Sequence, residues 1–153
     1  MTAVAPLVIK CDGIWVGWPG IQLSSQNEPI PESNPNDQSP TAGLKSSQVE
    51  AILVEPSLFS EYYNGCCNGT FWPLFHSMPD RAVFKSTTYE AYKAVNEFFA
   101  YKTVDALRKC IARLNRDGKT DVVPIVWIHD YQLMLAATTV RKVNDFTCCF
   151  FTF

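Results

Sequence analysis

An apolar run that ends abruptly in a polar cluster constrains this chain more than any other feature. Residues 122–128 (Val-Val-Pro-Ile-Val-Trp-Ile) are apolar throughout, and His129, Asp130 and Tyr131 follow at once. A short run of this kind is typical of a strand that is buried on both faces of a parallel sheet. Because Pro124 cannot donate to a strand ladder, we expect pairing to begin at or after it. The carboxyl ends of such strands border the ligand crevice of open α/β sheets, so Asp130 is a candidate ligand-binding residue.

Asp130 has two interpretations from the pattern alone. An ionised Asp offers two acceptor oxygens and no donor, so it can accept hydrogen bonds from the hydroxyls of a polyol. Asp is also a favoured N-cap residue, and residues 132–141 have the pattern of a helix. Both roles stay open at this point.

Further strands and loops are predicted in the first half of the chain. Residues 4–16 are apolar enough to supply an early strand, and residues 49–54 predict another, ended by Pro56. Residues 57–63 predict a short helix or turn that leads into a Gly- and Asn-rich loop over residues 65–70.

The longest helix signal covers residues 88–115, where apolar side chains recur near helical spacing. Thr87 and Glu90 have the spacing of a capping box, and Gly118 is placed to end the helix. With residues 132–141 as a second helix, strands and helices alternate. The sequence therefore predicts an α/β fold with a mostly parallel, doubly wound sheet and flanking helices.

Composition changes sharply over residues 24–48, which are mostly Ser, Pro, Asn, Gln, Asp and Glu. Few apolar groups are present there to offset the entropy lost on ordering. We expect a flexible surface loop that is longer than most connections within a domain.

Charge and cysteine usage exclude several classes of partner. The net charge is -2, so no basic face for nucleic acid is expected. No apolar run approaches the ~18 residues of a membrane span and no secretory signal opens the chain, so we expect a cytoplasmic protein. The six cysteines include the neighbours Cys66 and Cys67 but no paired zinc-type spacing, so reduced thiols and no metal site are expected.

Two aromatic residues are candidates for contact with a small polar ligand. Trp72 precedes Pro73 and offers a flat apolar face with one N–H donor, although the pattern alone favours packing in the core. The phenol of Tyr63 is able to reach a phosphate or to complete a turn. The pattern does not choose between these roles.

Three segments, in order, resemble the trehalose-6-phosphate synthase family. They are residues 15–20 (WVGWPG), residues 61–64 with 71–76 (EYYN and FWPLFH), and residues 126–135 (VWIHDYQLML). Residues 65–70 and 77–81 resemble the animal branch in particular. The resemblance extends over about residues 2–143.

The resemblance implies a fold and an activity. Members of this family are retaining GT-B glycosyltransferases with two Rossmann-like domains, and they transfer glucose from UDP-glucose to glucose 6-phosphate. No metal or other cofactor is implied, since UDP-glucose is a co-substrate. The residues aligned with Tyr63, Trp72 and Asp130 contact glucose 6-phosphate in the family, so these three are the expected substrate-binding residues.

The resemblance also implies that the chain is truncated at both ends. Residues 1–143 correspond to part of the N-terminal, acceptor-binding domain, and residues 144–153 form a divergent apolar tail. The donor-binding domain, the catalytic loop and the family's N-terminal Arg segment have no counterpart, so no catalytic residue is assigned. We expect a fragment or short isoform that is inactive alone. The alternative is a non-catalytic sugar-phosphate-binding or regulatory module that associates with the full-length enzyme.

Overall fold

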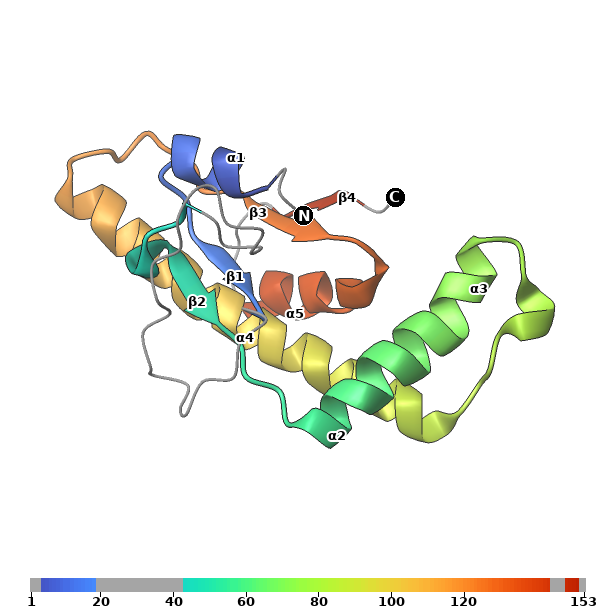
Figure 1. The fold of residues 1–153 in the computed structure, drawn as a ribbon. Coiled ribbons are helices and arrows are strands. Elements are labelled where there is room, and N and C mark those ends of the chain that lie inside the picture. The colour runs from blue at the N-terminus through green and yellow to red at the C-terminus, as the bar shows by residue number, and fades with distance from the viewer. Residues whose placement is uncertain (1–3, 19–42, 144–147, 152–153) are drawn as a thin grey trace. The chain divides into compact units, whose positions relative to one another are not determined.

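The computed structural model describes residues 4–18 and 43–143, together with the backbone of residues 148–151. These residues form two compact units, which we describe separately. The long helix α4, Ser86–Arg116, contributes its first part to one unit and its last part to the other (Figure 1).

One unit contains residues up to Leu53 and residues 105–123. Its elements are α1 (Ala5–Lys10), β1 (Trp15–Gly17), the 3-10 turn η1 (Ser46–Gln48) and β2 (Val49–Ala51). Strands β1 and β2 are parallel, with Trp15 opposite Val49 and Gly17 opposite Ala51. The strand predicted at residues 49–54 is thus confirmed but shorter, and η1 occupies the end of the predicted 24–48 loop. Residues 24–42 lie outside the described residues.

The strand predicted over residues 4–16 is wrong for most of its length. Residues 5–10 form α1 and only residues 15–17 form a strand. Pro6 lies in the first turn of α1, where its fixed φ suits a helix and its missing N–H costs nothing. The chain then reverses at Asp12, whose φ is +50°, and the Gly13 amide donates back to the carbonyl of Val8 at 2.8 Å. Local turn chemistry therefore overrides the apolar composition.

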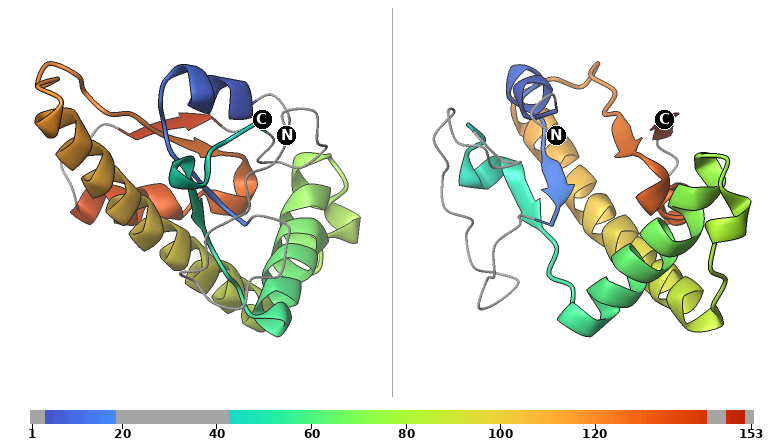
Figure 2. Two further views of the ribbon diagram at one scale, coloured as in Figure 1. Left: turned by 60° about the vertical axis from the view of Figure 1, so that its left-hand side comes forward. Right: turned by 45° about the vertical axis from the view of Figure 1, so that its right-hand side comes forward.

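The other unit contains residues 54–104 and 124 onward. It begins with one continuous helical segment made of α2 (Pro56–Phe59), the wide π-helix η2 (Ser60–Phe71) and α3 (Trp72–Phe75). The short 3-10 turn η3 (Pro79–Arg81) precedes α4. After α4 come β3 (Val126–His129), the 3-10 turn η4 (Tyr131–Leu133), α5 (Ala136–Val143) and β4 (Cys148–Phe151). Figure 2 shows β3 from two further sides.

Strand β3 begins two residues after Pro124, as predicted. It alternates buried and exposed side chains, so the prediction of a strand buried on both faces is wrong. It pairs in parallel with β4, with Val126 opposite Cys148 and His129 opposite Phe151. Both pairings in the described residues are parallel. The α/β prediction is confirmed.

The Gly- and Asn-rich loop predicted at residues 65–70 is wrong, because these residues lie inside η2. Cys66 and Cys67 are buried there. A Cβ atom on Gly65 would lie only 2.6 Å from the Thr88 side-chain methyl of α4. Glycine in this segment therefore permits close helix packing rather than a turn.

The predicted helix at residues 88–115 is confirmed as α4, but its start differs from the prediction. The helix begins at Ser86, so Thr87 lies within it and is not the N-cap. The Thr88 hydroxyl instead donates back to the carbonyl of Lys85 at 2.9 Å. The C-terminal prediction is confirmed, because Gly118 has a φ of +70° and Lys119 N donates to Leu114 O at 2.9 Å.

The second predicted helix, residues 132–141, is divided in the structure into η4 and α5. The core of this unit lies where η2, α4 and η4 meet. It consists of buried side chains that the sequence had spread over three separate segments: Tyr62, Cys66, Cys67, Ala91, Tyr92, Val95 and Tyr131.

Candidate functional site

Asp130 stands immediately after the carboxyl end of β3 and is half-buried. Its Oδ1 atom accepts a hydrogen bond from the Tyr131 amide at 2.7 Å. The carboxylate therefore caps the η4 turn, and does not cap α5 directly. Its backbone has φ +67° and ψ 171°, a region that is almost reserved for glycine and costs about 1 to 3 kcal/mol in other residues. Such strain is concentrated at functional sites, which makes Asp130 the most distinctive residue of this unit.

Trp72 begins α3 and is not a core residue, since 46% of its surface is exposed. Its ring centroid lies 3.6 Å from that of His76 and 6.3 Å from that of Tyr131. The Trp72 carbonyl lies 2.8 Å from His76 Nδ1. A carbonyl only accepts, so Nδ1 carries the proton and the His76 ring is held against the indole.

Tyr63 lies one turn into η2, with 38% of its surface exposed. Its ring stacks on Phe59 at a centroid distance of 5.3 Å and an interplanar angle of 16°. Phe59 holds the phenol ring, while the exposed part of the side chain remains accessible to a ligand.

Tyr131 contacts two of the three predicted residues, and the sequence analysis assigned it no role. It contacts the Trp72 ring, and its amide binds the Asp130 carboxylate. Burial raises the pKa of Tyr131, and the neighbouring Asp130 charge and the Tyr63 phenol raise it further. Trp72 and Asp130 therefore both adjoin one buried tyrosine. Tyr63 is connected to the same turn through Tyr62, whose ring centroid lies 6.4 Å from that of Tyr63 and whose hydroxyl donates to the Gln132 carbonyl at 3.2 Å. The motif position next to Asp130 was the only sequence signal for Tyr131.

The thiols under this site are not nucleophiles at neutral pH. Burial, together with the nearby Cys66 and Asp130, raises the pKa of Cys67 to about 12. Burial also raises the pKa of Cys66. Only the thiolate is reactive, so both cysteines act as packing residues. Within the described ranges, no cluster of three or more His, Cys, Asp or Glu side chains is suited to a metal ion.

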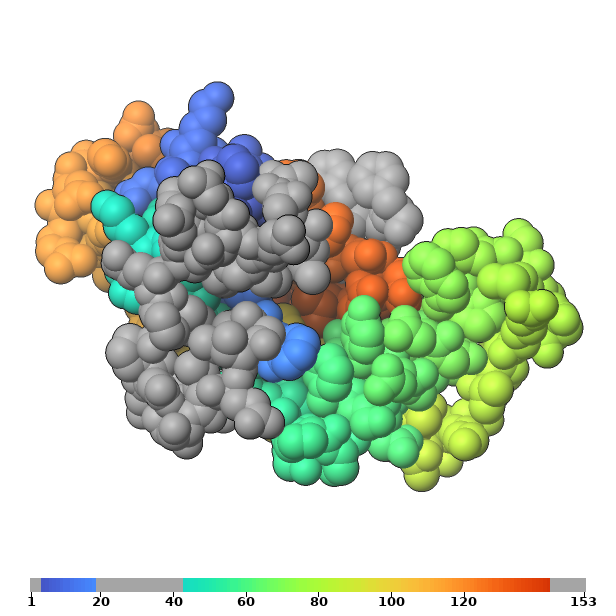
Figure 3. Space-filling model, in the orientation of Figure 1, coloured from blue at the N-terminus to red at the C-terminus, as the bar shows by residue number. Residues whose placement is uncertain are grey.

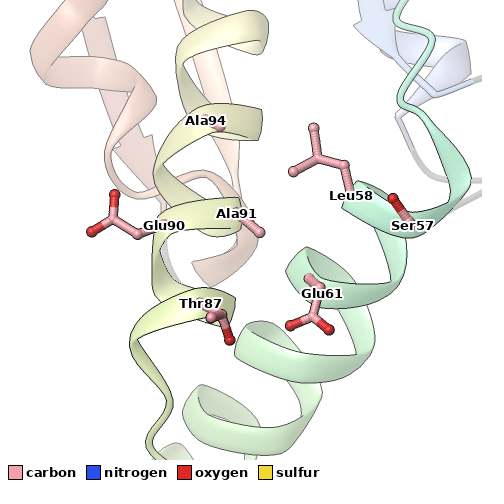
Figure 4. Close-up of a pocket in the computed structure, with 7 residues that line it drawn as sticks. All are labelled: Ser57, Leu58, Glu61, Thr87, Glu90, Ala91 and Ala94. Carbon is pink, nitrogen blue, oxygen red and sulfur yellow. The ribbon is translucent and has the colours of Figure 1, made fainter.

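A shallow groove of about 380 Å³ lies elsewhere in this unit, between the α2–η2 segment and the first turns of α4 (Figure 4). Leu58 on one side and Ala91 and Ala94 on the other give the groove its apolar lining, and Glu61 and Thr87 lie near one end. None of the three predicted binding residues lines it. We do not assign this groove to the predicted site.

The parallel pairings and the helices define an α/β fold, and comparison with solved structures identifies its class as GT-B glycosyltransferase. The chain is similar to the apo structure of OtsA, with a TM-score of 0.66 and 26% identity over 98% of this chain and 29% of that one. It is also similar to a UDP-forming α,α-trehalose-phosphate synthase from Burkholderia xenovorans in complex with glucose-6-phosphate. That comparison has a TM-score of 0.62 and 26% identity over 92% of this chain and 26% of the other.

The particular family follows from the sequence. Residues 1–153 match the sequence model of Glycosyltransferase family 20, and the chain belongs to this family. It is 30% identical over 128 residues to α,α-trehalose-phosphate synthase [UDP-forming] 1 of Aspergillus fumigatus, covering 84% of this chain and 21% of that protein. It is 32% identical over 138 residues to the bifunctional trehalose-6-phosphate synthase/phosphatase of Thermoproteus tenax, covering 90% of this chain and 16% of that protein.

The chain thus spans about a sixth to a quarter of the length of the curated relatives it matches. Within the part of the chain that the structure describes, no helix has both the length and the apolar character needed to cross a bilayer.

Proposed function

We propose that this chain is the acceptor-binding part of a trehalose-6-phosphate synthase and that it binds glucose 6-phosphate through Tyr63, Trp72 and Asp130. The contact of both Trp72 and Asp130 with Tyr131 is the observation that carries the proposal. The half-exposed indole of Trp72 suits the C–H face of a sugar ring. The Asp130 carboxylate accepts hydrogen bonds from sugar hydroxyls, and the Tyr63 phenol donates to phosphate.

In this proposal the acceptor sugar lies at the carboxyl end of β3, against Trp72. Its hydroxyls are oriented by Asp130, so the hydroxyl that attacks UDP-glucose is held in one direction. The UDP-glucose site is proposed to lie in the portion of the relatives that this chain does not match. We therefore expect the 153-residue polypeptide to bind the acceptor without transferring glucose.

Titration of the 153-residue chain with glucose 6-phosphate tests the proposal. We expect a change in Trp fluorescence and a rise in thermal stability at millimolar ligand. Trp72→Ala and Asp130→Asn should each weaken binding at least about 10-fold, which corresponds to about 1.4 kcal/mol. Trp127→Phe, which changes an exposed Trp on β3, is the matched control and should bind normally.

Two results would contradict the proposal. The binding part fails if the wild-type chain gives no response to glucose 6-phosphate up to about 10 mM, well above the usual KM range for enzymes. The expectation of no transfer fails if the purified chain releases UDP continuously from UDP-glucose and glucose 6-phosphate.

A non-catalytic module that associates with a full-length synthase is the second candidate function. Exposed apolar side chains on the β3 segment favour it, since Ile125 and Trp127 are 67% and 50% exposed. Parallel sheets normally have both faces covered. Co-purification with a full-length family member, abolished by Ile125→Asp, would support this role. If no family member co-purifies, only the acceptor-binding proposal remains.

A cytoplasmic location is likewise proposed, and cell fractionation tests it.

A further inference from the structure

The backbone that follows Asp130 is held by side chains from a distant helix. Tyr92 of α4 is fully buried, and its hydroxyl donates to the Tyr131 carbonyl at 2.7 Å. The same oxygen accepts from the Met134 amide at 3.3 Å. One phenol thus joins both ends of the η4 turn, and burial raises its pKa, so it stays protonated and able to donate.

Asn96 lies one turn further along α4 and is 1% exposed. Its Nδ2 donates to the carbonyls of Tyr92, at 2.9 Å, and Gln132, at 3.0 Å. Its Oδ1 accepts from the amides of Leu135, at 3.0 Å, and Ala136, at 3.2 Å. All donors and both acceptor sites of this buried amide are therefore occupied. Asn96 caps the start of α5 from another helix, 40 residues away in the chain.

The side chains of Tyr92 and Asn96 meet a specific need of this segment. Asp130 has a backbone conformation with φ +67° and ψ 171°, which a non-glycine residue keeps only when its surroundings impose it. The Asp130 side chain provides one local bond, to the Tyr131 amide. The remaining constraint comes from the bonds that fix residues 131–136.

We infer that Tyr92 and Asn96 are positioning residues that hold the turn after β3 and thereby keep Asp130 in its strained conformation, with its carboxylate directed at the acceptor site. The assignment of a ligand to Asp130 rests on the proposed function. The mechanical part, the coupling between Asn96 and the Asp130 backbone, does not depend on it. Neither residue is expected to touch the ligand.

A double-mutant cycle on stability tests the mechanical part with the full 153-residue chain. Asp130→Gly removes the strain. The change in urea midpoint that this substitution causes should be clearly more favourable in the wild-type background than in the Asn96→Leu background, because Asp130 has already relaxed in Asn96→Leu. Val95→Ala is the matched background, because Val95 is buried beside Asn96 in the same helix and its apolar side chain makes no hydrogen bond to the turn. There the wild-type effect of Asp130→Gly should persist. Equal effects in the wild-type and Asn96→Leu backgrounds would overturn the inference.

Where Asn96→Leu does not fold, Tyr92→Phe replaces it in the cycle. This change keeps the buried ring and removes only the hydroxyl that joins Tyr131 and Met134. Hydrogen exchange at the Leu135 and Ala136 amides should accelerate at least 10-fold in Asn96→Leu, which removes their acceptor, and much less in Val95→Ala, which keeps it. Unchanged exchange in Asn96→Leu would also overturn the inference.

A second cycle measures glucose 6-phosphate affinity. Asn96→Leu and Tyr92→Phe should each weaken binding at least 10-fold, and Asn96→Leu combined with Asp130→Asn should bind no more weakly than Asp130→Asn alone. Additive losses, or an equal loss in Val95→Ala, would show a merely structural role. If the stability coupling is present but the wild-type chain binds no glucose 6-phosphate, the proposed function fails and the positioning role stands. If binding is present and both cycles are additive, the positioning role fails alone.

Discussion

At the scale of single residues, Gly65 shows how a small side chain sets the distance between two helices. It lies within η2, where the sequence pattern predicted a loop. A Cβ atom added to Gly65 would lie 2.6 Å from the Thr88 Cγ2 atom, which is closer than side chains tolerate. Because Cys66 and Tyr92 belong to the core around this contact, separation of the helices would loosen the packing beneath the candidate site.

Gly65→Ala should destabilise the chain by about 1 to 3 kcal/mol, since an added methyl group forces a packed interface apart. Thr88→Ser removes the opposing methyl group and keeps the hydroxyl that binds the Lys85 carbonyl. The double variant should therefore recover most of the loss in urea unfolding. Gly13→Ala is a suitable control, because its nearest contacts would be at 3.6 Å. Equal losses for the single and double variants would show that Thr88 is not the obstacle.

At the scale of elements, α4 is the best-predicted part of the chain, and its C-terminal end shows why. Gly118 takes a φ of +70°, and the amides of Gly118 and Lys119 donate to the carbonyls of Asn115 and Leu114. This is the Schellman pattern, which depends on one residue in the left-handed region. Local chemistry alone determines it, so the sequence pattern was sufficient.

Gly118→Ala should cost about 1 to 2 kcal/mol, because an L side chain disfavours the left-handed conformation. An added Cβ would meet no atom within 4 Å, so the cost is conformational and not steric. Gly118→Asn should cost less, since Asn adopts this region more readily. Urea unfolding of both variants measures the difference; an equal cost for Ala and Asn would contradict this account.

The start of α4 and the η2 segment show the opposite case. The capping box predicted at Thr87 is not formed, and residues 65–70 are helical in spite of two glycines and two asparagines nearby. In η2, contacts between helices outweigh local preference, as they commonly do for helix propensity. Such contacts are not visible in a window of sequence.

At the scale of the molecule, the core under the site contains several ionisable groups that are kept neutral. Burial raises the pKa values of Cys67, Tyr62 and Tyr92, and that of Cys67 reaches about 12 from an ordinary value near 9. Above pH 9 the unfolded chain therefore releases protons that the folded chain retains. The stability from these groups is complete below about pH 9 and is lost as pH rises toward the folded pKa.

We expect the free energy of unfolding to fall by about 1 kcal/mol between pH 9 and 10 on account of Cys67 alone. Urea unfolding over this range measures the slope. Cys67→Ala removes this group and should give a shallower slope, although Tyr62 and Tyr92 keep some pH dependence. Parallel curves for the wild type and Cys67→Ala would contradict the assignment.

The sequence by itself determined the α/β class, the start of β3 after Pro124, the length of α4 and the family. These features depend on local periodicity, on the missing amide of proline and on short motifs. It also indicated Tyr63, Trp72 and Asp130 as binding residues, which stays a proposal.

Only the tertiary structure decided that η2 replaces a loop and that Tyr131 contacts both Trp72 and Asp130. It also assigned Tyr92 and Asn96 to the turn after Asp130. The physical reason is the same in each case. Close helix contacts and buried hydrogen bonds join residues about 25 to 70 positions apart, and no local pattern records which distant partner will satisfy a buried polar group.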